Sequence, residues 1–341
     1  MTSNRRVLTV VVSLVAVIAL IAVFIATRGP KDFPGPGTGS TTVIVVRGDS
    51  LSGIANTLVE AGVVASSDAF VSAASSNPKA KSIGPGRYAM LEEMSGAGAV
   101  ALMLDAKSRA ESRLILPEGL RINQSLAIAS TATSIPVDDL DAALKQAPSL
   151  GLPAYASGNA EGFLFPASYD LAGDETADTT LKMLFARFNQ ASRELQLDKH
   201  AAVVGQSPYD IMKIASLVQA EGNPSDYSKI ARVIYNRLAK GMRLEFDTTI
   251  AYGLGITKVS LTSEQLKTDT PYNTRLHAGL PPTPINSPGA AAIKAALNPA
   301  QGNWLYFVTV NLDTGETKFA KNYKRFLKYK AQLQAYLRNH G

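Results

Sequence analysis

Hydrophobic residues recur at helical spacing in the middle of the chain. Ile211, Ile214 and Val218 are three and four residues apart, and Glu221 takes the next position of the same stripe. A helix face that is otherwise apolar packs inward, so we expect the Glu221 carboxyl to lie in the interior or in a cleft. Residues 222–224, Gly-Asn-Pro, predict the end of this helix, with the glycine in the left-handed conformation.

A carboxyl group placed in this way loses part of its solvation, which raises its pKa. A carboxylic acid that keeps its proton near neutral pH is suited to protonating a glycosidic oxygen. The same spacing is also produced by a buried ion pair or by a carboxylate at the edge of the surface. Glu221 is therefore a candidate catalytic acid. The groups around its carboxyl distinguish this role from a buried ion pair or a carboxylate at the edge of the surface.

The N-terminal region carries a second strong pattern, because residues 7–27 contain no charged side chain and are mostly Val, Ile, Leu and Ala. About 20 such residues cross a hydrocarbon core as a helix. We predict a cytoplasmic stub and a retained single-pass transmembrane helix over residues 1–28. Arg5 and Arg6 favour a cytoplasmic N-terminus, which places the rest of the chain outside the cytoplasm. A cleaved signal peptide is the alternative, although its apolar run is usually shorter.

Residues 29–40 are rich in Pro and Gly and predict a linker that spaces the globular part from the membrane. A strand at 42–46, a Gly-Asp-Ser turn and a helix at 51–58 follow. This arrangement resembles the start of a LysM-type glycan-binding module, and the alternative is a generic α/β subdomain. We therefore predict a small LysM-like subdomain over residues 41–108.

The remaining residues, 109–341, predict a larger mixed domain with further helices and a β-hairpin at 304–319. Neither a regular β-α alternation nor a helical repeat is visible, so the fold class predicted for the whole chain is α+β. The segment 321–341 has six basic and no acidic residues, interleaved with apolar residues at helical spacing. It predicts an amphipathic C-terminal helix with a solvated basic face, and attraction to anionic lipid or wall polymer is the alternative.

Composition excludes several kinds of chemistry. The chain has no cysteine, which rules out disulfides, thiolate metal sites and a cysteine nucleophile. Its three histidines, His200, His277 and His340, are far apart in sequence and form no metal-binding motif. No phosphate-binding loop is present. We expect neither a metal nor a cofactor, and nucleic acid is not an expected partner of a domain outside the cytoplasm.

Four further residues are candidate substrate ligands. Asp247 supplies a second carboxylate, and its alternative role is to cap a helix or loop. Tyr272 and Asn273 lie in a proline-stiffened loop. Glu161 begins an aromatic-rich segment, and because aromatic side chains serve both sugar sites and cores, core packing is the alternative for that segment.

Four blocks of the chain, taken together and in this order, resemble the endolytic murein transglycosylases, the YceG-like family. The resemblance covers most of the chain from about residue 41. The blocks are Leu116–Gly119, Glu161–Pro166, Ala215–Glu221 with Asn236–Leu238 and Gly241–Leu244, and Tyr272–Thr274 with Gly279–Pro282.

The resemblance implies a membrane-tethered enzyme that cuts peptidoglycan glycan strands internally, between N-acetylmuramic acid and N-acetylglucosamine. The catalytic Glu of the family ends the third block, and Glu221 is the matching position. The family commonly has a charged pair just before this Glu, whereas this chain has Gln219 and Ala220. Asp247, Tyr272 and Asn273 would orient the sugar or stabilise positive charge.

Such an enzyme needs only one acid, because the muramyl 6-hydroxyl attacks its own anomeric carbon and forms a 1,6-anhydro end. A hydrolase usually needs two carboxylates. The expected partners are peptidoglycan glycan strands, the inner membrane and peptidoglycan synthases. The alternatives are a muramidase that uses water and a non-catalytic, membrane-tethered wall-binding scaffold.

Overall fold

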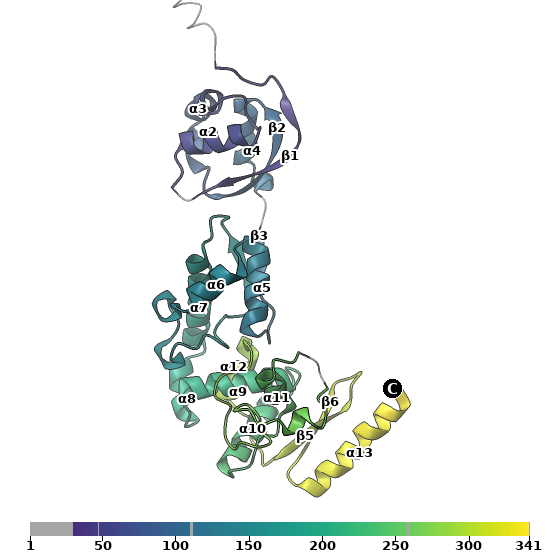
Figure 1. The fold of residues 1–341 in the computed structure, drawn as a ribbon. Coiled ribbons are helices and arrows are strands. Elements are labelled where there is room, and N and C mark those ends of the chain that lie inside the picture. The colour runs from purple at the N-terminus through teal and green to yellow at the C-terminus, as the bar shows by residue number, and fades with distance from the viewer. Residues whose placement is uncertain (1–29, 47, 110–111, 258–259, 341) are drawn as a thin grey trace, which may run out of the picture. The chain divides into compact units, whose positions relative to one another are not determined.

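The computed structural model describes four stretches of the chain, residues 30–46, 48–109, 112–257 and 260–340. Within them lie twelve α-helices and three two-stranded sheets, which confirms the α+β class (Figure 1). The chain forms two compact units, one with the residues up to Ser112 and Leu171–Asp174, the other with the remainder. Short 3₁₀ turns lie at Pro78–Ser82, Ala106–Ser108, Ala147–Leu150, Ala154–Ala156 and Gln265–Lys267.

The transmembrane helix predicted over residues 7–27 lies outside the described residues. Of the helices that the structure does describe, none combines the length and the apolar character needed to cross a bilayer. The membrane anchor therefore stays a prediction from the sequence.

The first unit is built from two strands and three helices. They are β1 (Pro36–Val45), α2 (Leu51–Glu60), α3 (Ser67–Ser75), β2 (Gly86–Met94) and α4 (Gly96–Leu104). The strands pair antiparallel, and each helix begins after a serine whose side chain accepts a hydrogen bond from a backbone N–H of the first turn. One apolar core lies between the sheet and the helices, with Leu58, Phe70 and Met90 at its centre.

The prediction of a linker over residues 29–40 is wrong for its last part, because Pro36 to Ser40 belong to β1. This part of the strand is mostly exposed, so it does not need apolar side chains. Its backbone pairs with the end of β2, with Pro36 opposite Met94 and Thr38 opposite Glu92. The register shifts between Thr38 and Thr41. Gly37, with φ of 95°, lets β1 come close to Met94, where a Cβ would lie 2.5 Å from Cγ.

The second unit is mainly helical. Its elements are β3 (Ser112–Ile115), α5 (Ile122–Thr133), α6 (Val137–Leu144), β4 (Ser168–Leu171), α7 (Ala177–Glu194), α8 (Leu197–Val203), α9 (Pro208–Glu221), α10 (Tyr227–Ala239), α11 (Asp247–Gly253), α12 (Ala290–Leu297), β5 (Tyr306–Asn311), β6 (Glu316–Ala320) and α13 (Tyr323–His340). The helix α9 contacts α8, α10, α11 and α12 (Figure 1). It is the element around which the unit packs.

The apolar stripe predicted on α9 is confirmed. Ile211, Ile214 and Val218 are completely buried, and Glu221 is the last residue of the helix. Burying each of these aliphatic side chains stabilises the fold by roughly 1.5–3 kcal/mol. Their combined burial fixes the rotation of α9 and, with it, the direction of the Glu221 side chain.

The predicted left-handed conformation of Gly222 is wrong. Its φ of −158° and ψ of −179° describe extended backbone that any residue can adopt. What favours glycine is the close approach of α10, since a Cβ would lie 2.1 Å from Ile230 Cδ1. The chain thus leaves α9 and enters α10 through a tight passage directly after Glu221.

A buried arginine holds three separate segments of the second unit together. Arg237 on α10 is 7% exposed. Its Nε donates to the Leu305 carbonyl at 2.7 Å, and its Nη1 donates to the carbonyls of Leu244 at 2.7 Å and Arg243 at 3.2 Å. These bonds satisfy buried backbone acceptors and tie the segment before α11 and the segment before β5 to α10.

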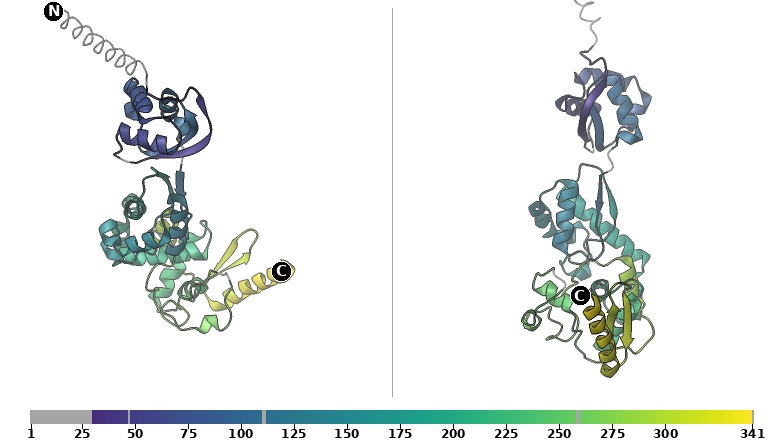
Figure 2. Two further views of the ribbon diagram at one scale, coloured as in Figure 1. Left: turned by 45° about the horizontal axis from the view of Figure 1, so that its top comes forward. Right: turned by 90° about the vertical axis from the view of Figure 1, so that its right-hand side faces the viewer.

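The β-hairpin and the C-terminal helix are both confirmed. The strands β5 and β6 pair antiparallel, and α13 packs along them (Figure 2). No residue of α13 is fully buried, so the helix covers the hairpin with one side and leaves its basic side in solvent. The contact is made by aromatic rings, with Tyr306 of β5 lying 5.4 Å from Phe326 of α13 between centroids.

Candidate active site

The Glu221 carboxyl lies between two cavities of the second unit. Its neighbours Ala220, Asp247 and Thr248 line a cleft of about 350 Å³. Glu221 itself lines a second cavity of about 360 Å³ together with residues of β5 and α13. A polymer chain that passed from one cavity to the other would therefore cross the carboxyl group.

Burial raises the pKa of Glu221 from its ordinary value of 4.5 to about 7. The main cause is desolvation of the carboxylate, and the negative charge of Asp247 adds to it. The hydroxyl of Thr248 donates a hydrogen bond to Glu221 Oε1, and this bond and the charge of Arg237 act in the opposite direction. The carboxyl is thus an acid whose proton is gained and lost near neutral pH.

The position of Thr248 follows from the way α11 begins. The Thr274 hydroxyl accepts a hydrogen bond from Phe246 N at 2.9 Å and pairs with the Thr249 hydroxyl at 2.9 Å. Glu245, just before this segment, has a φ of 57°, a left-handed value that is uncommon for a residue with a side chain. The bonds to Thr274 hold this turn and aim Thr248 at Glu221.

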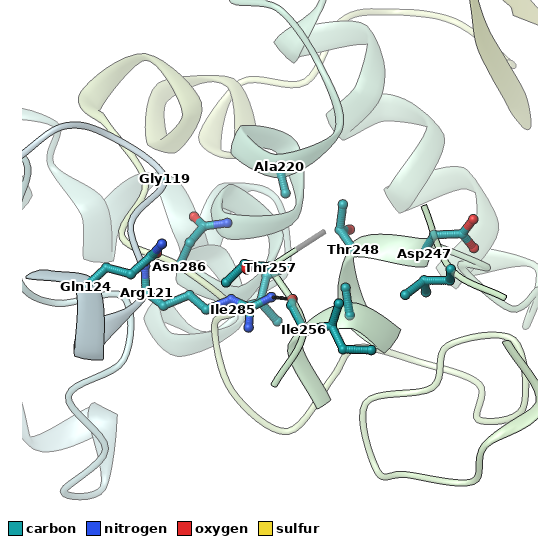
Figure 3. A pocket seen from close by; sticks show the side chains of 12 residues that line it. Gly119, Arg121, Gln124, Ala220, Asp247, Thr248, Ile256, Thr257, Ile285 and Asn286 are labelled. Carbon is teal, nitrogen blue, oxygen red and sulfur yellow. Dashed lines mark hydrogen bonds between the residues drawn. The ribbon is translucent and has the colours of Figure 1, made fainter. Parts of the chain in front are cut away.

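The cleft is shown in Figure 3. Its lining includes Thr248 and Ala220 on one side and Arg121 and Asn286 on the other, while the Asp247 carboxylate points away from Arg121. Arg121 supplies a positive charge, and its Nη2 donates to the Ile256 carbonyl at 2.6 Å. The lining of the cleft therefore contains one carboxylate, that of Asp247, one cation and several neutral polar groups, and Glu221 adjoins it through Ala220 and Thr248.

Asp247 lines the cleft as the first residue of α11. Its Oδ1 accepts hydrogen bonds from Nε of Arg275 at 2.9 Å and from Nη2 at 2.8 Å. Both side chains are about half exposed. Because Arg275 holds this carboxylate in an ion pair, Asp247 is not a free second acid, although its negative charge still raises the pKa of Glu221.

Tyr272 is not among the residues that line the cleft. Its hydroxyl is hydrogen-bonded to the Thr283 hydroxyl at 2.9 Å, and its ring lies 4.9 Å from the ring of Tyr252. These contacts stiffen the proline-rich loop. The structure gives Tyr272 a role in shaping the wall rather than a free hydroxyl for a sugar.

The prediction that Asn273 binds substrate is contradicted by its position. The side chain is completely buried. Its Nδ2 donates to the carbonyls of Leu266 at 3.1 Å and Thr268 at 2.8 Å, and its Oδ1 accepts from Arg275 N at 3.0 Å. All of its hydrogen-bonding capacity is directed at the loop, so Asn273 organises the backbone that presents Arg275.

Glu161 is also buried rather than presented to the cleft, with 3% of its surface exposed. Its Oε1 accepts from Ile122 N at 3.1 Å, and its Oε2 accepts from the Tyr252 hydroxyl at 3.0 Å. Desolvation raises its pKa to about 7. Since the Arg121 guanidinium lies 5.2 Å from the centroid of the Tyr252 ring, Glu161 acts on the cleft by positioning these two residues. Its neighbours Phe163 and Phe165 are core residues.

Gln219, where the family commonly has a charge, is a structural link in this chain. Its Oε1 accepts from Gly289 N at 3.0 Å, and its Nε2 donates to the Tyr227 hydroxyl at 2.9 Å. The side chain connects α9 to the start of α12 and to α10. The neutral amide can accept from one partner and donate to the other, which a carboxylate could not do.

Sequence reasoning missed Thr248, Arg121 and Arg275. Each reaches the site through a contact between distant parts of the chain, so no local spacing indicates it. The one usable signal is that Thr248 directly follows the candidate Asp247 at a predicted helix start. Among the described residues, no group of His, Cys, Asp and Glu side chains is arranged to hold a metal ion.

Comparison with known proteins places the chain in a family. Two curated relatives are named endolytic murein transglycosylase. The Bacillus subtilis protein is 34% identical over 172 residues, which cover 50% of this chain and 47% of the relative. A Streptococcus pneumoniae protein is 30% identical over 171 residues, covering 48% of this chain and 30% of the relative. The chain thus spans less than half the length of these relatives.

A solved structure shows likeness over more of the chain. The crystal structure of a yceG-like protein from Listeria monocytogenes matches with a TM-score of 0.59 and 26% identity, covering 86% of this chain and 99% of that one. The model of the YceG-like family matches residues 43–332. Because that match takes in the helix that carries Glu221 and both cavities beside it, the chain belongs to the YceG-like family.

Proposed function

We propose that the protein is an endolytic lytic transglycosylase that cleaves the bond between N-acetylmuramic acid and N-acetylglucosamine in peptidoglycan and limits the length of nascent strands. The observation that carries this proposal is the half-buried Glu221 carboxyl, with a pKa near 7, between two cavities. The names of the curated relatives support the reaction class.

The mechanism needs one acid and no water. Protonated Glu221 gives its proton to the glycosidic oxygen, the bond from the muramyl C1 to that oxygen breaks, and the N-acetylglucosamine leaves with a new hydroxyl group. The muramyl 6-hydroxyl then bonds to C1, and its proton passes to the Glu221 carboxylate. Atoms balance, the acid is regenerated, and the product carries a 1,6-anhydro ring.

The surroundings of Glu221 suit this double role. The Thr248 hydroxyl donates to Oε1, which leaves the acidic proton to Oε2. The other carboxylates that line the two cavities are ion-paired, Asp247 with Arg275 and Glu245 with Arg237, whereas a hydrolase usually places a free second carboxylate beside its acid. This arrangement favours the transglycosylase over a muramidase that uses water.

For the first unit we keep the prediction that it binds cell-wall glycan. It has two antiparallel strands separated by two helices, and we propose that it is a LysM-like glycan-binding subdomain. Binding of purified peptidoglycan by the full-length chain should weaken when charged residues replace its exposed apolar side chains, such as Ile44 and Val59. Unchanged binding would contradict the assignment.

Replacing Glu221 with Gln should abolish turnover with little effect on folding. The amide keeps the shape and an acceptor for Thr248 but cannot supply the proton, so turnover should fall by at least about 10²-fold. The measurement is release of muropeptides from purified peptidoglycan, with a thermal melt of each variant. Glu264→Gln is the matched control, since Glu264 is exposed, and should keep full activity. A folded Glu221→Gln protein with normal turnover would show that Glu221 is not the catalytic acid, whereas a wild type without turnover would favour the scaffold alternative.

The pH dependence of activity should follow the pKa of Glu221. The acid must be protonated at the start, so kcat/KM should fall as pH rises above about 7. Glu161 has a similar pKa, and Glu161→Gln tests which carboxyl is responsible. The fall should stay at the same pH in this variant. If it moved or vanished, Glu161 rather than Glu221 would control the reaction.

The same raised pKa has a consequence for stability. Between about pH 4.5 and 7 the folded protein binds more protons than the unfolded chain, so its free energy of unfolding should decrease as pH rises through this range. Glu221→Gln removes one of the two groups, so the variant should be more stable than wild type by about 3 kcal/mol at pH 8 but by little at pH 4.5, because each pKa unit corresponds to about 1.4 kcal/mol. Urea unfolding at both values measures the difference, and an equal effect at both would contradict the raised pKa.

We propose in addition that the protein is a single-pass membrane protein with a cytoplasmic N-terminus and an extracytoplasmic catalytic domain. The support is the run without charge over residues 7–27 and the preceding Arg5 and Arg6. Partnership with peptidoglycan synthases would follow from this location. Protease added to spheroplasts should digest the bulk of the chain, and protection of that bulk would contradict the topology.

A further inference from the structure

The second cavity beside Glu221 is walled by aromatic rings and carries free positive charge. We call it the aromatic cavity; its lining includes Glu221, Arg275, Tyr306, Tyr323, Phe326 and Lys330. The strand β5 supplies one wall, α13 supplies another, and the residues before α11 close the inner end. The two walls lie side by side in Figure 2.

Three of its rings form one cluster. The centroids of Tyr306 and Phe326 are 5.4 Å apart with nearly parallel planes, and each lies 5.8 Å from Tyr323. Tyr323 is 57% exposed, a large apolar surface for a residue that anchors the start of α13. An aromatic face that stays open to solvent beside a candidate glycosidase acid is suited to stacking on the C–H face of a sugar ring.

The three cationic side chains that line the aromatic cavity differ in how many hydrogen-bond and ion-pair partners they have. The guanidinium of Arg237 is used by three backbone carbonyls and by Glu245, 3.6 Å away. Arg275 is bound to Asp247 through Nε and Nη2, which leaves its Nη1 hydrogens free of that carboxylate. Lys330 is exposed, and within the part of the chain that the structure describes it has neither an ion pair nor a hydrogen bond to its ammonium group.

The helix places Lys330 on the same face as the rings. Tyr323, Phe326 and Lys330 are spaced by three and four residues, so they form one stripe on α13. Lys328 lies two residues away, roughly on the opposite face of the helix. Lys330 therefore reaches the aromatic cavity from the face of α13 that carries the rings, and Arg275 reaches it from the loop that is bound to Asp247.

A polysaccharide of neutral sugars would use the rings but would have no need for the two cations. Peptidoglycan carries a lactyl ether and an acidic peptide on every second sugar. We propose that the aromatic cavity binds a muramyl residue with its stem peptide, stacking the sugar on Tyr323, which Tyr306 and Phe326 hold in place, and binding the peptide carboxylates with Lys330 and Arg275. This inference rests on the proposed function, and it specifies peptide-bearing strands rather than strands stripped of peptide as the preferred substrate.

The test compares two substrates and three variants of the full-length chain in detergent. The substrates are glycan strands with intact stem peptides and bare strands, from which an amidase has removed the peptides and whose exposed lactyl carboxylates have then been converted to neutral amides. Lys330→Gln should lower kcat/KM on the peptide-bearing strands by about fivefold to tenfold, the size of one charge-assisted contact, and leave the bare strands unaffected. Tyr323→Ala should lower it on both. Lys328→Gln, the matched control, should change neither.

Binding separates this inference from the proposed reaction. In the Glu221→Gln background, the Kd for peptide-bearing strands should be lower than that for bare strands, and Lys330→Gln should remove the difference. High salt should reduce the difference as well. If wild type cleaves nothing while this pattern holds, the transglycosylase proposal fails and the binding assignment stands. If Lys330→Gln affects both substrates equally or neither, the assignment is overturned.

Discussion

The site depends on the guanidinium of Arg237. This buried group donates to the carbonyls of Arg243, Leu244 and Leu305 and thereby joins α10 to the segment before α11 and to the segment before β5. The first of these segments leads into α11, whose Thr248 donates a hydrogen bond to Glu221, and the second begins a wall of the aromatic cavity. A buried charge without its partners is costly, so these three contacts are strongly coupled. Together with the stronger effect of the Thr248 hydrogen bond, the positive charge also opposes the rise in the pKa of Glu221 that burial causes.

The same few helices and strands position the acid Glu221 and form the two cavities beside it. The helix α9 is oriented by its apolar stripe, which leaves Glu221 at the point where the chain turns sharply at Gly222. On one side lies the cleft with Arg121, which is positioned by Glu161 through Tyr252. On the other side lie the rings of β5 and α13. Because desolvation and hydrogen bonding are both set by packed residues, the carboxyl is prepared before a substrate arrives.

The sequence predicts those features that depend on the local spacing of apolar residues. The stripe of α9 and the place of Glu221 on it follow from spacings of three and four residues, and the structure has them as expected. Thr248 could not be predicted in the same way, because its contact with Glu221 joins residues that are distant in sequence. Asn273 was misjudged because a polar residue in a loop can face the backbone as well as a ligand. Residues 36–40 were misjudged because pairing with β2, and not side-chain burial, orders them.

The central claim is that Glu221 serves one muramyl residue as acid and then as base, without water. The most direct test is mass analysis of the new chain ends that the full-length protein releases from purified peptidoglycan. The account predicts muramyl ends in the 1,6-anhydro form, with no oxygen taken up from ¹⁸O-labelled water. Reducing muramyl ends that carry the label would contradict it, because they would show that water rather than the 6-hydroxyl attacks the anomeric carbon.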